Sequence, residues 1–171
     1  MMSKMSNSIL DSGNRTEFAT GAVRDIQEGK GRCDLLPLDI VRLLIPMEKD
    51  DHDIFDYIYV FMKSGDENYL IKAANAFISQ FYPDTYTAII ELSKHFEDGS
   101  KKYGDYNWQK GIPLSRYVDS ALRHFLKYLR GDKDEPHDRA CLWNLVCGAW
   151  TCKHKEELNC YLISEITRNL V

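Results

Sequence analysis

Residues 91–138 read ELSKHFEDGSKKYGDYNWQKGIPLSRYVDSALRHFLKYLRGDKDEPHD, and this stretch decides the expected fold. Apolar residues recur in it at the three- and four-residue spacing of an α-helix. A loop that carries Gly104, Gly111 and Pro113 interrupts that spacing once. The pattern predicts two helices joined by a turn, with acidic, basic, histidine and aromatic side chains gathered around the turn.

The two predicted helices run over residues 85–103 and 116–130. Ser115 is a typical residue at a helix start, and Gly131 is a typical residue just past a helix end. Each helix has one apolar stripe that should face the core. The core-facing residues are Ile89, Leu92, Phe96 and Tyr103 in the first helix and Val118, Leu122, Phe125 and Leu129 in the second.

Further helices are predicted on both sides of this pair. The spacing of apolar residues predicts helices over residues 69–81 and 155–169. Residues 137–152 are apolar on most faces, which is typical of a buried helix. The segment 54–61 (IFDYIYVF) fits either a helix or a buried strand. Because strand-like alternation is absent elsewhere, the predicted fold class is all-α.

The length of 171 residues suits one domain with a sizeable core, so a single domain over 1–171 is expected. Composition divides this domain into five parts. They are a disordered start at 1–13, an ordered loop at 14–39, extra helices at 40–85, core catalytic helices at 86–152 and a C-terminal helix at 155–170.

Charge and cysteine content narrow the partners and the location. A net charge of −4 argues against a nucleic-acid polymer as partner, since proteins that bind one usually present a basic face. No apolar run approaches the roughly 20 residues that span a bilayer, and no export signal is recognisable at the start. Five cysteines, an odd number, fit free thiols in a reducing compartment. We therefore expect a cytoplasmic protein without a membrane partner.

A glycine-rich part of residues 14–39 carries cations that could hold a phosphate. Arg24, Lys30 and Arg32 stand near glycines, whose backbone amides can approach an anion closely. A surface loop with solvated charges accounts for the same residues, so both interpretations stay open.

The predicted turn is rich in residue types that contact nucleotides. Lys102 could bind phosphate, and Asn107 could bind a base edge or a ribose. Tyr103 and Trp108 could stack on a base. Trp108 could equally fill the core.

Several charged residues near the second helix have structural explanations as well. Asp119 and Arg123 are four residues apart, which suits an ion pair on one helix face. A lone histidine such as His124 is more often a packing residue than a catalyst. The acids of residues 132–138 suit the positive end of the next helix, which explains them better than it explains His137.

Five segments together resemble the phage and bacterial dATP/dGTP diphosphohydrolase family, which is similar to the MazG-like all-α nucleotide pyrophosphohydrolases. They are TGAVRD, GKGRCDLLP, HFEDGSKKYGDYNW, GIPLSRYVDSALRH and CLWNL. The resemblance covers residues 20–39 and 88–150, and it implies a MazG-like helical bundle with additional N-terminal helices. It also implies hydrolysis of a purine deoxynucleoside triphosphate (dATP or dGTP) to the monophosphate and pyrophosphate. By analogy, the protein would be a homo-oligomer, a dimer or higher, in the host cytoplasm if phage-encoded.

The resemblance further implies a set of site residues around Mg²⁺ or Mn²⁺. The implied metal ligands are Glu97, Asp119 and Glu135. The implied catalytic residues are Glu97, Asp119 and His124. The implied substrate-binding residues are Arg24, Lys30, Arg32, Lys102, Tyr103, Asn107, Trp108, Arg123 and His137.

The chain departs from the ExxE and ExxD motifs of MazG-like enzymes. Lys94 and Ser100 stand three positions on either side of Glu97, and Arg116 stands three positions before Asp119. The metal shell of those enzymes is therefore not carried over as a whole. An alternative function is a non-catalytic protein that sequesters or senses a nucleotide in the same pocket. A third is a structural or interaction protein whose charges form ion pairs.

Overall fold

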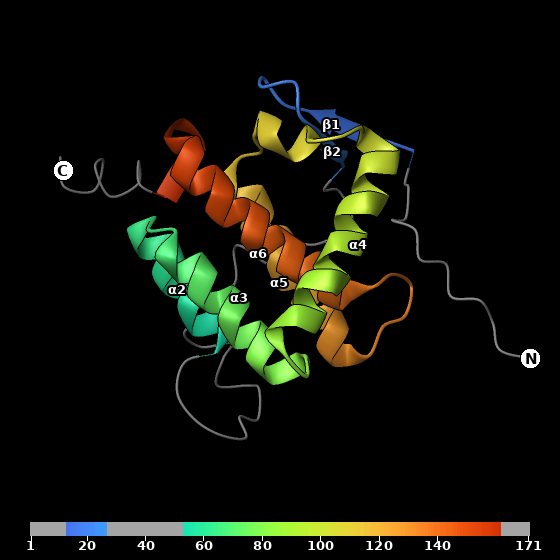
Figure 1. Cartoon of the computed structure of the whole chain (residues 1–171). Coiled ribbons are helices and arrows are strands. Elements are labelled where there is room, and N and C mark those ends of the chain that lie inside the picture. The colour runs from blue at the N-terminus through green and yellow to red at the C-terminus, as the bar shows by residue number, and fades with distance from the viewer. Residues whose placement is uncertain (1–12, 27–52, 162–171) are drawn as a thin grey trace, which may run out of the picture.

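The computed structural model of the chain describes residues 13–26 and 53–161 (Figure 1). Five α-helices make up most of these described residues, and the strands among them form one two-stranded ribbon. The predicted all-α fold class is confirmed. The predictions that lie outside the described residues are those for 1–12, 27–52 and 162–171, among them the phosphate-binding roles of Lys30 and Arg32.

Helices α5 (Leu114–Arg130) and α6 (His137–His154) form the centre of the structure and pack against each other. Helix α4 (Thr85–Tyr103) contacts α6, and so does α3 (Asn68–Phe81), which carries α2 (Ile54–Ser64) with it as a hairpin (Figure 1). Helix α6 is thereby buried over most of its surface, as its apolar sequence predicts. None of the helices in the described ranges is long and apolar enough to cross a membrane.

Helix α2 shows why the ambiguous segment 54–61 is helical. The Asp53 side chain accepts a hydrogen bond from the Asp56 backbone amide at 2.9 Å, and the Asp56 carboxylate accepts one from the Asp53 amide at 3.2 Å. This reciprocal capping box satisfies amides that a helix start leaves without partners. Gly65 then ends the helix with φ of 65°, a conformation that glycine adopts without strain.

Helix α4 has the predicted bounds, 85–103, and a buried face that overlaps the predicted stripe. Leu92 and Phe96 pack against the core as predicted, but the fully buried residues are Ala88 and His95. Two residues that were expected to face the core are exposed instead: Ile89 at 54% and Leu129 of α5 at 42%.

Helix α5 begins at Leu114, two residues before the predicted start, with Pro113 rather than Ser115 in the cap position. Proline suits this place because its fixed φ fits a first turn and its missing amide hydrogen is not needed there. Beyond α6, the 3₁₀ turn η4 (Glu156–Leu158) stands where the C-terminal helix was expected to begin.

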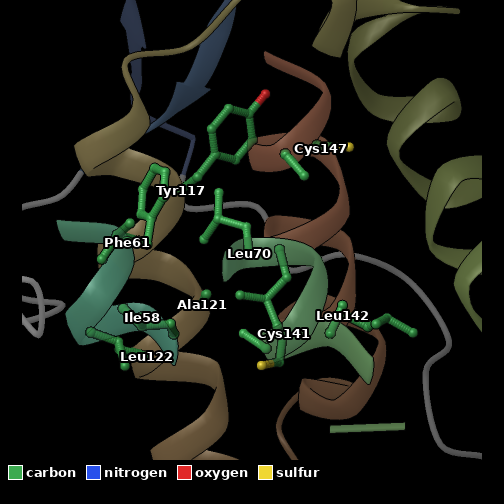
Figure 2. Packing of buried hydrophobic residues seen from close by; sticks show 14 of the residues in the cluster. Ile58, Phe61, Leu70, Tyr117, Ala121, Leu122, Cys141, Leu142 and Cys147 are labelled. Atoms are coloured by element: carbon green, nitrogen blue, oxygen red, sulfur yellow. The ribbon is translucent and has the colours of Figure 1, made fainter. Parts of the chain in front are cut away.

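The core fills the space between α2, α3, α5 and α6. Large apolar side chains from the four helices meet there, and burial of each contributes about 2 kcal/mol. Figure 2 labels Ile58, Phe61, Leu70, Tyr117, Ala121, Leu122, Cys141, Leu142 and Cys147 in this cluster. Cys141, Cys147 and Cys152 are buried free thiols, and Cys160 is an exposed one.

A two-stranded antiparallel ribbon replaces the described part of the predicted ordered loop. Strands β1 (Arg15–Glu17) and β2 (Val23–Asp25) pair with Thr16 opposite Arg24. The Thr20 hydroxyl donates a hydrogen bond to the Gly111 carbonyl at 2.7 Å, which ties the ribbon to the turn between α4 and α5. The ribbon thereby places Arg24 and its neighbours against the central helices.

Candidate functional site

A cavity of about 1290 Å³ lies between the ribbon, α4, the α4–α5 turn, α5 and α6. Its volume exceeds what a small-molecule site of several hundred Å³ requires. The predicted site residues that line it are Arg24, Glu97, Tyr103, Asn107, Trp108, Arg123, His124 and Glu135. Asp119, Lys102 and His137 lie outside its wall among the described residues.

Arg24 is the most enclosed cation of the cavity. Its Nη2 donates to Asn144 Oδ1 at 2.9 Å, and Asn144 is held in turn by donation to the Ala140 carbonyl at 2.7 Å. The guanidinium lies about 6 Å from the ring centres of Tyr117 and Trp143. Burial lowers the pKa of Arg24, because desolvation disfavours the charged form. Its Nη1 atom is buried without a hydrogen-bond partner among the described residues.

Asp25, next in the ribbon, makes polar contacts with three residues near the cavity. The Tyr103 hydroxyl donates to Asp25 Oδ1 at 3.2 Å, and the Lys102 ammonium lies 3.5 Å from Asp25 Oδ2. Arg116 Nη2 donates to the Asp25 carbonyl at 3.4 Å. Burial, followed by the charge of Asp25, raises the pKa of Tyr103. Lys102 is therefore placed as a partner of Asp25, behind the cavity wall.

Aromatic rings form one wall of the cavity. The Phe96 ring stands edge-on to the Trp108 ring, with 5.6 Å between the ring centroids, and its centroid lies 6.1 Å from that of Trp143. Trp108 also meets Trp150 edge-on at 4.9 Å. Trp108 packs against the core cluster and also lines the cavity, and its stacking on a base stays a prediction.

Asn107 sits beside this wall in the η3 turn (Asn107–Lys110). Its Nδ2 donates to the Val23 carbonyl at 3.4 Å, which fixes the orientation of the amide. Its Oδ1 is buried and accepts no hydrogen bond from the described residues. The amide oxygen can therefore accept a hydrogen bond from a ligand in the cavity.

His95 is a cavity residue that the sequence pattern does not distinguish, because it lies within a regular helix. It is buried beside the Trp143 ring, 5.8 Å away, and its Nδ1 lacks a partner in the described part of the chain. Burial lowers the pKa of His95 to about 4, with the charges of Arg139 and Arg24 acting in the same direction. The imidazole is therefore neutral near pH 7.

Two histidines and two acids converge where α5 ends and α6 begins. His124 Nδ1 and His137 Nδ1 are 3.0 Å apart, and Glu135 Oε1 lies 3.5 and 3.7 Å from them. His137 Nε2 lies 2.7 Å from Asp134 Oδ1. Burial lowers the pKa of His124 well below the ordinary value, and the charges of Arg123 and His137 add to this effect. His124, Glu135 and Asp134 line the cavity, while His137 is packed behind them.

The other two predicted metal ligands are not part of this cluster. Asp119 is 1% exposed and accepts from Arg123 Nη1 at 2.8 Å, which is the ion pair that the four-residue spacing suggests. Glu97 is 64% exposed at its side chain and pairs with Lys101. Among the described residues, the two groups that bring three possible ligand atoms within 4.8 Å both contain His137, and neither contains Glu97 or Asp119. The predicted shell of three carboxylates, which would suit Mg²⁺, is therefore not assembled there.

Residues 77–160 match the family model described as dATP/dGTP diphosphohydrolase, N-terminal. Over these residues, just under half of the chain, the sequence is similar to this family. The match confirms the resemblance read from the sequence for residues 88–150, whereas residues 20–39 lie outside it. It contains every residue of the cavity wall except residues 23–26. Neither the curated proteins nor the solved structures gave a match.

Several residues of the matched segment line the cavity although the sequence did not assign them to the site. Among them are His95, Arg116, Asp134 and Asn144. Asp134 could have been found, since it stands three residues before His137 and such a spacing brings two side chains together at a helix start. His95, Arg116 and Asn144 depend on how the ribbon and helices pack, which no local spacing records.

Proposed function

We propose that the protein hydrolyses a purine deoxynucleoside triphosphate, dATP or dGTP, to the monophosphate and pyrophosphate. Water adds across the linkage between the α- and β-phosphates, and the bond to the pyrophosphate group breaks. Support comes from the family match together with a cavity that combines guanidinium groups with an aromatic wall.

One observation carries the proposal: three buried polar atoms without partners in the described ranges all belong to cavity residues. They are Arg24 Nη1, His95 Nδ1 and Asn107 Oδ1. Each buried polar atom without a hydrogen bond costs about 1–3 kcal/mol, so a folded protein keeps few of them. A polar ligand that fills the cavity would supply their hydrogen bonds, and a nucleotide offers the acceptors and donors for all three.

The phosphates are assigned to the arginines. Arg24 offers a buried guanidinium with an available N–H, and Arg123 is oriented by hydrogen bonds to Asp119 and to Ser120 Oγ, the latter at 2.9 Å. A guanidinium presents several N–H donors in one plane, which suits the oxygens of a phosphate. Asp119 would then act as a positioning residue through Arg123.

The nucleoside is assigned to the aromatic side of the cavity. Phe96, Trp108 and Trp143 present enough ring surface to pack a purine base. Asn107 Oδ1 would accept a hydrogen bond from an amino group of the base, which both adenine and guanine carry. Because cytosine also carries an amino group, the proposed source of a purine preference is the larger purine ring packed against the aromatic side chains.

Divalent-cation dependence, on Mg²⁺ or Mn²⁺, is part of the proposal. The catalytic and metal roles of Glu97 and Asp119 stay predictions, and they are tested by Glu97→Gln and Asp119→Asn. Loss of turnover in a folded Glu97→Gln variant would support such a role for Glu97, and full activity in either variant would remove the role of that residue. For Asp119, a metal role also requires weaker binding of the divalent cation in Asp119→Asn, because loss of turnover alone would follow from misplacing Arg123 as well. Circular dichroism on both variants reports whether the fold is kept.

The remaining parts of the proposal concern assembly and location. We propose a homo-oligomer, a dimer or higher, and note that Tyr86, Ile89 and Ile90 leave an exposed apolar face on α4. Light scattering after size exclusion measures the assembly directly. A cytoplasmic location would give access to the nucleotide pool.

The test of function is incubation of the full chain with each dNTP and rNTP in the presence of Mg²⁺ or Mn²⁺. Chromatography of the products should show dAMP or dGMP and pyrophosphate in equal amounts. Release of triphosphate or inorganic phosphate instead, or no turnover of any nucleotide, would contradict the proposal.

A non-catalytic nucleotide-binding protein is the second candidate. It is favoured by the absence of an assembled carboxylate shell among the described residues. Saturable binding of dATP or dGTP without any product, with Mg²⁺ and with Mn²⁺, would establish this alternative.

A further inference from the structure

We propose that His124, Glu135 and His137 bind one transition-metal ion, of the class of Mn²⁺, Co²⁺ or Zn²⁺. Their three possible ligand atoms lie within 4.8 Å of one another at the junction of α5 and α6. Two come from imidazoles and one from a carboxylate. The ion would occupy the point between these atoms.

The triangle of ligand atoms has the dimensions of a metal site. Its sides are 3.0 Å between the two Nδ1 atoms and 3.5 and 3.7 Å from these to Glu135 Oε1. The point equidistant from the three corners of such a triangle lies about 2.0 Å from each, and zinc binds imidazole nitrogen and carboxylate oxygen at about 2.0–2.2 Å. The spacing of the three ligand atoms is therefore that of ligands around one ion.

The surroundings of His137 prepare it as a ligand. Its Nε2 stands 2.7 Å from Asp134 Oδ1, so the ring donates its Nε2–H there and turns an Nδ1 lone pair toward His124 and Glu135. Lys127 Nζ holds the other oxygen of Asp134 at 2.7 Å. A carboxylate behind a histidine ligand fixes the tautomer and the ring orientation in many metal sites.

The donor set selects the class of ion. Mg²⁺ and Ca²⁺ prefer ligand sets made of oxygen, whereas imidazole nitrogen suits zinc and other transition metals. Two histidines with one carboxylate also leave coordination positions open. Since His124 and Glu135 line the cavity, those positions would face it. A role of the ion in holding a phosphate oxygen or a water rests on the proposed function, but the metal site itself does not.

The test is titration of the metal-free full chain with Co²⁺, followed by visible absorption and by calorimetry. One ion per chain should bind, and Zn²⁺ should displace it, while the same concentration of Mg²⁺ should not. Glu135→Gln and His137→Gln should each weaken Co²⁺ binding at least about tenfold, and Asp134→Asn should weaken it by about 10–100-fold. His154→Gln, at an exposed histidine at the end of α6, is the matched control and should bind Co²⁺ like the wild type.

Two results would overturn the metal site. One is the lack of saturable Co²⁺, Mn²⁺ and Zn²⁺ binding by the wild type, and the other is unchanged binding in a folded Glu135→Gln variant. Glu135 is the more accessible ligand, so its variant carries the test if His137→Gln fails to fold. Co²⁺ binding without nucleotide hydrolysis upholds the site and counts against the proposed function alone. Hydrolysis with Mg²⁺ by a protein that binds none of the three ions would overturn the metal site and support the proposed function.

Discussion

Helices α5 and α6 are shared by two halves of the molecule, one around the α2–α3 hairpin and one around the cavity. The two halves differ in whether their buried polar atoms have hydrogen-bond partners. Beside the hairpin, Asn159 Nδ2 and Cys152 Sγ both donate to the Gly65 carbonyl, at 2.8 and 3.2 Å. Around the cavity, Arg24, His95 and Asn107 each keep a buried polar atom without a partner in the described chain. The first half is complete as a folded structure, whereas the second is arranged for a ligand.

This contrast implies that core substitutions near the hairpin cost stability and leave the chemistry alone. Phe77 is fully buried and packs against Phe81, Phe125 and Tyr128. Phe77→Ala should lower the free energy of unfolding by about 3–5 kcal/mol through lost contacts and an unfilled cavity. Urea denaturation measures the loss, and turnover per folded molecule should stay at the wild-type value. A large fall in that turnover would show that the two halves are not separable.

Substitution at the cavity should lower the activity and leave the stability nearly unchanged. Arg123→Lys keeps a positive charge but loses the planar pair of hydrogen bonds to Asp119 and Ser120. We expect kcat/KM for the purine substrate to fall about 100-fold, or about 2.7 kcal/mol, with little change in unfolding. An unchanged kcat/KM would place Arg123 outside the substrate site.

His95 makes the contrast measurable as a function of pH. Its folded pKa is lowered to about 4 from an ordinary value of 6.5, so between these values the unfolded chain binds a proton that the folded chain does not. The stability that neutral His95 provides is present above pH 6.5 and is lost as the pH falls toward 4. From pH 7 to pH 5 the loss should be about 2 kcal/mol, and His95→Gln should remove this part of the dependence. Equal pH dependence in wild type and variant would contradict the burial of this imidazole.

The smallest expected effect is at Asn107. Asn107→Leu removes a buried oxygen that lacks a partner among the described residues, but it also removes the long Nδ2 hydrogen bond to the Val23 carbonyl, so the free energy of unfolding should change little. Affinity for the purine nucleotide should fall about tenfold, because the base loses its acceptor. Calorimetry and urea denaturation on the same sample separate the two effects, and unchanged affinity would argue against contact with the base.

Local signals allowed much of the fold to be predicted. Helix α4 has the expected bounds because Asp84 caps its start, accepting from the Thr87 amide at 2.8 Å, and Gly104 follows its end. The ion pair of Asp119 and Arg123 follows from their helical spacing in the same way. These features depend on neighbours within about one turn, and such neighbours can be read from the sequence.

Features that depend on packing were harder to predict. The ribbon was not predicted because strands of three residues are too short to show the alternation of apolar and polar residues that is typical of a strand. The exposure of Ile89 depends on the angle at which α4 meets α6, and helical periodicity does not fix that angle. The buried atoms of Arg24 and His95 are brought together from segments about 70 residues apart, so only the folded chain reveals their convergence.

Binding of a non-hydrolysable dGTP analogue, measured by calorimetry, tests most directly whether the cavity is the nucleotide site. One analogue should bind per wild-type chain. Arg24→Gln should weaken binding about 100-fold, since it replaces the buried guanidinium with a neutral amide. Arg15→Gln, exposed on the same ribbon and outside the cavity wall, should bind like the wild type. Equal affinity in wild type and a folded Arg24→Gln variant would contradict the account.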